Sequence, residues 1–189
     1  MTPLVSAEEI GRRYPNADED MLQRIRRAVA LVNEQAHPQG VQAHFDVDDS
    51  LCLCGYTPSG KDIKAHLAGS TAVVVGVCTI GATIDRLIER TKVSDLATAY
   101  FVDLAASYAV ENLAERECAR LGQQCRQQGL LCTTRYSCGY GDFDLRDQPT
   151  LLALSGADKA MRIQVNDGGM MYPTKTITYM VGLIPARTL

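Results

Sequence analysis

The first forty residues carry the hydrophobic spacing of amphipathic helices. Ser6 and Asn16 each stand three residues before a glutamate, which is the spacing of a capping box, so we expect a helix to begin at each. In the second helix the apolar residues recur at the helical period and leave the arginines between them facing solvent. The apolar positions are Met21, Ile25, Ala28, Val29 and Val32. Residues 1–40 are therefore predicted to form an N-terminal helical segment.

The pattern then changes to that of a sheet. Residues 41–47 alternate between apolar and polar, which is typical of a half-buried strand, and residues 51–55 are expected to pair back against it as a hairpin. Residues 71–79 are almost entirely apolar and rich in β-branched side chains, which predicts a strand buried on both faces. Further strands are expected near residues 130–136, 161–165 and 174–183.

Helices are expected between these strands. Ser59 is positioned to cap a short helix over residues 61–67, and Ser94 to cap an unusually long one that runs past Leu113. Two more are expected, one from Gly81 and one over residues 148–154. We predict an α+β fold: a single domain spanning residues 1–189, with a mostly antiparallel sheet and helices packed on it, including one long helix.

Composition excludes several classes of function. The 22% charged and 46% hydrophobic content is ordinary for a globular protein, and a net charge of −3 provides no broad basic field for a nucleic-acid backbone. The longest apolar run, residues 72–78, is far too short to span a bilayer, and the polar N-terminus has no signal-peptide core. We therefore expect a cytoplasmic protein that binds neither nucleic acid nor membrane.

The run from Arg135 to Asp142 combines a cation with a glycine-hinged loop, Gly139-Tyr140-Gly141. Glycine lets the backbone approach a ligand closely, and arginine offers a planar fork of donors that matches a carboxylate or phosphate. The same residues would also suit a purely structural turn that is held in place by the arginine. The run by itself leaves both interpretations open.

Seven cysteines offer a different chemistry. None of them forms the Cys-x-x-Cys pair typical of zinc or iron–sulfur sites, so no metal site is expected. Most should behave as small apolar side chains. The exception is Cys138, a candidate reactive thiol, because the nearby Arg135 could lower its pKa.

Several short blocks appear in a fixed order around this run. They are residues 59–63, 66–67, 78–81, Asp85, 109–111, Gln148, 151–152 and 170–178. In this order and spacing the chain resembles the activation domain of cobalamin-dependent methionine synthase, in its small stand-alone form. The resemblance covers nearly the whole chain.

The resemblance implies an accessory protein that binds S-adenosylmethionine and supports the reductive remethylation of cobalamin. The cobalamin would be carried by a methionine synthase module or another corrinoid protein, with an electron donor that the sequence does not identify. Positioning is the whole task, so no catalytic nucleophile is expected from this chain. The alternative is a corrinoid-associated redox or metal-binding module that uses the cysteines and no S-adenosylmethionine.

The resemblance also implies roles for individual residues. Arg135 would take the ligand's carboxylate, and Glu111 would face its cationic end. Ser137, Gly139 and Tyr140 would complete the ligand loop, with the Gly139-Tyr140 turn on the nucleotide side. Further along the chain, the residues implied to contact a partner or cofactor are Tyr172 and Lys175.

Overall fold

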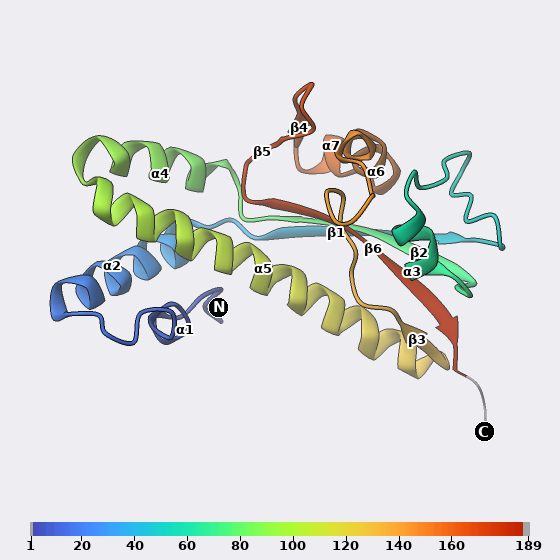
Figure 1. Cartoon of the computed structure of the whole chain (residues 1–189), viewed down its shortest axis with the longest axis horizontal. Coiled ribbons are helices and arrows are strands. Elements are labelled where there is room, and N and C mark those ends of the chain that lie inside the picture. The colour runs from blue at the N-terminus through green and yellow to red at the C-terminus, as the bar shows by residue number, and fades with distance from the viewer. Residues whose placement is uncertain (1, 187–189) are drawn as a thin grey trace.

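A four-stranded sheet with helices on both faces forms the centre of the molecule (Figure 1). The computed structural model describes residues 2–186. Every pair of neighbouring strands in this sheet is antiparallel. In spatial order the strands are β1 (Gln39–Asp46), β2 (Ala72–Thr79), β6 (Thr176–Pro185) and β3 (Leu130–Cys132). The predicted α+β class with a mostly antiparallel sheet is confirmed.

The side chains of β2 explain why helices cover both faces. Val74 packs with Leu121 of the long helix α5 (Leu96–Gln127) on one face. Val73 and Val75 point the other way and pack with residues of α3 (Lys61–Leu67) and α6 (Gln148–Ser155). A strand buried on both sides needs apolar residues along its length, and the sequence of β2 supplies them up to its last residue, Thr79.

A helical bundle extends beyond one end of the sheet (Figure 1). In it, α1 (Ala7–Gly11), α2 (Glu19–Gln35) and α4 (Ala82–Ser94) gather around the first half of α5. The apolar positions predicted in α2 are buried here, apart from the partly buried Met21. The remaining elements are η1 (Leu145–Asp147), α7 (Ala157–Ala160), β4 (Gln164–Val165) and β5 (Met171–Tyr172).

Helix starts show where capping rules succeeded and failed. Ser6 forms the predicted capping box with Glu9. The other three caps differ from the predictions, which named Asn16, Ser94 and Ser59. In each case the carboxylate of an aspartate accepts hydrogen bonds from the amides at the start of the helix. The capping residues are Asp18 for α2, Asp95 for α5 and the distant Asp142 for α3.

The predicted hairpin between residues 51–55 and β1 is wrong. Strand β1 pairs along its whole length with β2, and Leu53 makes only an isolated bridge to Tyr56. Both Leu51 and Cys54 adopt positive φ angles, 52° and 50°, which are incompatible with a regular strand.

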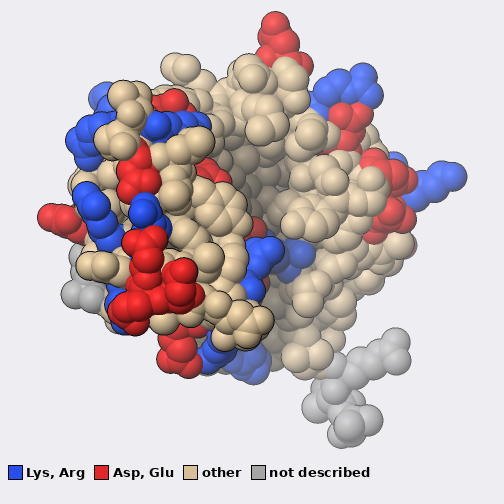
Figure 2. Space-filling model, turned by 60° about the vertical axis from the view of Figure 1, so that its left-hand side comes forward, with Lys and Arg blue, Asp and Glu red and all other residues tan. Residues whose placement is uncertain are grey.

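Charges of both signs are interspersed over the helical end of the molecule (Figure 2). The same view shows a hollow between this end and the remainder of the surface. No helix within residues 2–186 is long and apolar enough to cross a membrane.

Candidate functional site

The loop after Arg135 is held against the central sheet by backbone hydrogen bonds. Tyr136 exchanges two with Met180 of β6, at N–O distances of 2.9 and 2.8 Å. The Gly139 amide then donates to the carbonyl of Phe143 at 2.8 Å and closes the turn. Gly139 has a φ of 87°, a conformation that glycine adopts without strain. The backbone conformation of the turn therefore requires glycine at position 139.

Gly141 is required for a different reason. Its φ is 52°, and a Cβ at this position would lie 2.2 Å from Oδ2 of Asp62 and 2.6 Å from the hydroxyl of Tyr136. No side chain fits there without displacing both groups. The sequence predicted that the glycine backbone would lie close to a ligand. In the structure Gly141 lies close to Asp62 of α3 and to Tyr136 of its own loop.

Arg135 reaches across to α5. Its Nε and Nη2 both lie 3.1 Å from Oε1 of Glu115, and Nη2 also donates to Oε2 of Glu111. Burial opposes the charge on the guanidinium, but the hydrogen bonds and attraction of the two glutamates outweigh it and raise the pKa of Arg135. The hydrogen bonds that the Arg135 side chain makes within residues 2–186 go to α5, and none goes to the Gly-Tyr-Gly turn.

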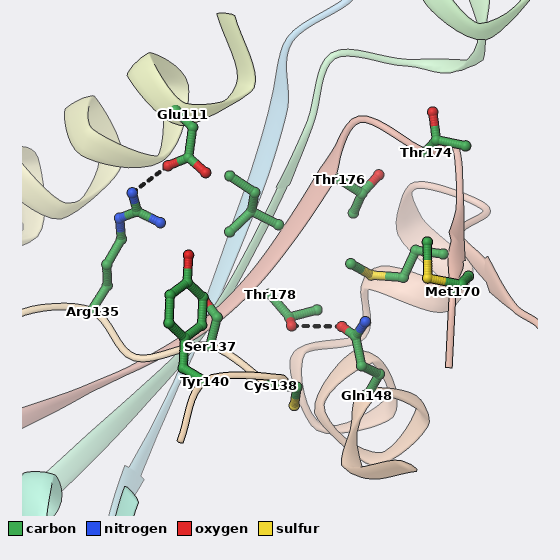
Figure 3. Close-up of a pocket in the computed structure, with 12 residues that line it drawn as sticks. Glu111, Arg135, Ser137, Cys138, Tyr140, Gln148, Met170, Thr174, Thr176 and Thr178 are labelled. Atoms are coloured by element: carbon green, nitrogen blue, oxygen red, sulfur yellow. Dashed lines mark hydrogen bonds and ion pairs between the residues drawn. The ribbon is translucent and has the colours of Figure 1, made fainter. Parts of the chain in front are cut away.

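A cavity of about 250 Å³ lies beside this ion pair (Figure 3). Arg135 and Glu111 point toward one another at one side, and the loop after Arg135 forms the adjoining wall (Figure 3). The structure brings together five of the predicted site residues in its lining: Glu111, Arg135, Ser137, Cys138 and Tyr140.

Polar side chains from α6 and β6 also line the cavity, and they were assigned no role from the sequence: Gln148, Thr176 and Thr178. Thr178 donates to Oε1 of Gln148 at 2.7 Å, and the Gln148 amide donates to the carbonyl of Gly169 at 2.9 Å. Thr176 lines the same cavity. The signal for the threonines was available, because they stand two residues apart in an otherwise apolar strand and so share one face.

The other predicted contacts lie outside this cavity. Gly139 shapes the loop without lining it. Tyr172 is exposed and lines a separate depression with Arg86. Lys175 pairs instead with Asp103 of α5 at 2.9 Å, with only 14% of its side chain exposed. It is therefore engaged with α5, and its implied contact with a partner or cofactor stays a prediction.

Cys138 differs from the expected reactive thiol. Its side chain is buried, and burial raises its pKa to about 12, the opposite direction to the one predicted from its nearness to Arg135. The negative charge of Asp147 raises the pKa of the thiol further. Within residues 2–186, no cluster of three or more His, Cys, Asp or Glu side chains is arranged to hold a metal ion.

The site can thus bind and orient a ligand that carries charges of both signs. The guanidinium of Arg135 can take an anionic group, and the carboxylate of Glu111 can take a cationic one beside it. Tyr140, which is 61% exposed, presents an aromatic ring at the same cavity. A ring in this position is suited to stacking on a flat, apolar part of the ligand.

Comparisons with known proteins agree with this architecture. No family model matches the sequence, and no curated protein matches it. A crystal structure described as the MetH reactivation domain bound to AdoHcy matches the fold with a TM-score of 0.69 and 11% sequence identity. The match covers 99% of this chain and 76% of that one. At this identity the likeness establishes the fold alone: the chain folds like the MetH reactivation domain.

Proposed function

We propose that this chain binds S-adenosylmethionine in the Arg135 cavity and supports the reductive remethylation of cobalamin on a methionine synthase or another corrinoid methyltransferase. The observation that carries the proposal is the convergence of Arg135 and Glu111 on one cavity in a chain with this fold. The solved domain with the same fold has AdoHcy bound, a ligand with the same amino-acid and nucleoside parts.

The charges of the site fit this ligand. Arg135 would bind its carboxylate, Glu111 would bind its ammonium group, and Tyr140 would stack against its adenine. The ligand supplies an activated methyl group and the partner's reduced cobalt is the nucleophile, so the residues of this chain need only bind and orient. This division of labour agrees with the state of Gln148 and Thr178 beside the cavity, which are buried and hydrogen-bonded to each other.

A protein partner is part of the proposal. Three exposed apolar side chains belong to the segments that frame the cavity: Tyr140, Leu145 and Met170. Leu145 packs close to both Gly139 and Gly169, so the three side chains come from adjoining segments. Such a rim suits a weak, transient contact with a corrinoid protein, which must leave during normal turnover.

Calorimetric titration with S-adenosylmethionine tests the proposal directly. We expect weak binding by the chain alone, accompanied by a rise in melting temperature. The titration is repeated with a cobalamin-loaded methionine synthase module under reducing conditions, where an interaction with the chain is expected. Absence of heat and of a thermal shift at millimolar ligand, with and without the corrinoid protein, would remove S-adenosylmethionine from the function.

A further inference from the structure

Arg135 has two carboxylate partners although its single charge needs only one. Glu111 and Glu115 are four residues apart on α5, so they lie on one side of the helix and repel each other. The guanidinium between them reduces this repulsion but leaves the group of three with one excess negative charge. An incoming carboxylate therefore meets an arginine that is already more than neutralised.

The two glutamates occupy different positions relative to the ligand cavity. Glu111 lines the cavity of about 250 Å³, whereas Glu115 lines an adjoining cavity of about 270 Å³ on the other side of Arg135. The side chain of Glu115 is also the more exposed, at 67% against 48% for Glu111. Glu115 can therefore leave the arginine at small cost, because its own carboxylate is already largely in contact with water.

The two cavities have three lining residues in common: Arg135, Ser137 and Tyr140. These side chains form a partition between two hollows that are each smaller than the roughly 300–1,000 Å³ of typical ligand sites. Both hollows are open to solvent, and moving the Arg135 side chain would join them into one site for a ligand composed of a nucleoside and an amino acid.

We propose that Glu115 is a specificity-determining latch: it holds the Nε–Nη2 edge of Arg135 in the empty site and must be displaced by the ligand's carboxylate. Glu111 remains in place to receive the ligand's ammonium group. This inference rests on the proposed function, and it adds a residue that contacts no ligand atom yet controls the affinity of the site.

The latch favours one chemical class of ligand. A simple anion would add a second excess negative charge to the group, which is unfavourable at these distances. An α-amino acid brings its own ammonium group beside the carboxylate, so it adds no net charge and pairs with Glu111 as well as Arg135. The site is thus selective for the amino-acid end of its ligand.

Two matched variants one helical turn apart test this. We expect Glu115→Gln to bind S-adenosylmethionine and S-adenosylhomocysteine about two- to fivefold more tightly than the native protein, the size of an ion pair whose carboxylate is exposed. Glu111→Gln should bind both more weakly. The affinity for 5′-methylthioadenosine, which has neither carboxylate nor ammonium group, should not change in Glu115→Gln. The gain should shrink in high salt.

The possible results separate this inference from the function on which it rests. If the native protein binds S-adenosylmethionine and Glu115→Gln binds it equally or less tightly, the latch is wrong and the function stands. A gain that extends to 5′-methylthioadenosine also contradicts it, since that ligand has no carboxylate to compete. If neither the native protein nor either variant binds any of the three compounds, the function and the latch both fail.

Discussion

The carboxylate of Asp142 caps the helix that begins at Lys61, eighty-one residues earlier in the chain, by accepting the Lys61 amide at 2.8 Å. Its other oxygen accepts the amide of Asp62 at 2.9 Å. Ser59, just before this helix, donates its hydroxyl to Asp147 at 2.6 Å. The end of the ligand loop is therefore fixed to α3, and the two segments should be stabilised or lost together.

Asp142→Ala should lower the melting temperature, because it leaves the amides at the start of α3 without their acceptor. These two amides lower the pKa of Asp142 below its ordinary value of 3.8. A lowered pKa in the folded state gives stability that is present above the unfolded value and lost as the pH falls through the folded one. The difference between native protein and variant should thus be full at neutral pH and shrink below about pH 4.

Thermal melts from neutral to acid pH measure this. Asp167→Ala is the matched control, because Asp167 is exposed and lies in the β4–β5 turn. A difference for Asp142→Ala that stays constant down to acid pH would contradict the cap.

Gly76→Ala should destabilise the protein by about 1–3 kcal/mol, the usual cost of overpacking a core. A Cβ on Gly76 would lie 2.1 Å from Cζ of the Tyr179 ring, which is fully buried and occupies the space over the glycine. Gly122→Ala is the control, because the nearest atom to its Cβ would be the flexible Arg126 side chain at 3.5 Å. In this helix interior the added methyl should stabilise by up to about 1 kcal/mol. Urea unfolding curves compare the two.

Much of the fold could be predicted from the sequence because its elements have strong local patterns. The continuous apolar run of β2 and the helical period of α2 each identified one element. The errors fell where a distant group decided the outcome. Serine at position 59 satisfied the local rule for a cap, yet Asp142 took that role from a segment that no local pattern connects to α3.

The site was predictable only in part, for the same reason. The loop from Arg135 to Tyr140 stands out as a motif, and Glu111 entered through resemblance alone. No sequence pattern predicts that Glu115 forms an ion pair with Arg135, because this contact between helix and loop depends on how α5 crosses the sheet. The predicted lowering of the Cys138 pKa was wrong, because the burial that raises it is a property of the fold and cannot be inferred from neighbouring residues in the sequence.

Gln148→Leu should cost about 1–3 kcal/mol of unfolding free energy, the penalty for leaving buried polar groups unpaired. The substitution removes the acceptor of the Thr178 hydroxyl and the donor to the Gly169 carbonyl. Thr178→Val removes one of the same bonds, so the double variant should cost less than the sum of the two. Denaturant unfolding of the three proteins measures the coupling. Strict additivity would show that the two side chains do not act as a unit.

Two thiols should react quickly with iodoacetamide in the native protein. Cys52 and Cys54 are exposed, whereas burial raises the pKa of Cys118 to about 11 and those of Cys132 and Cys138 to about 12. A thiol with a raised pKa has little of the reactive thiolate at pH 8. Cys78 and Cys125 are buried, so mass spectrometry should find these two and the three thiols with raised pKa labelled only after unfolding. Fast labelling of Cys138 would contradict its burial and restore it as a reactive group.

Arg135→Ala should weaken S-adenosylmethionine binding by about 1.5–3 kcal/mol, the range for a hydrogen bond to a charged group. Arg135→Lys keeps the charge but loses the two-point geometry of the guanidinium, so it should recover only part of the affinity. The ligand-free protein should lose less than about 1 kcal/mol of stability in Arg135→Ala, since the glutamates that lose their partner are largely exposed to solvent. Arg90→Ala, an exposed arginine on α4, controls for the change in net charge. Calorimetry and thermal melts on the same samples keep the two effects apart. A strongly destabilised Arg135→Ala protein with nearly normal affinity would remove the arginine from the ligand site and leave it as a strut between the loop and α5.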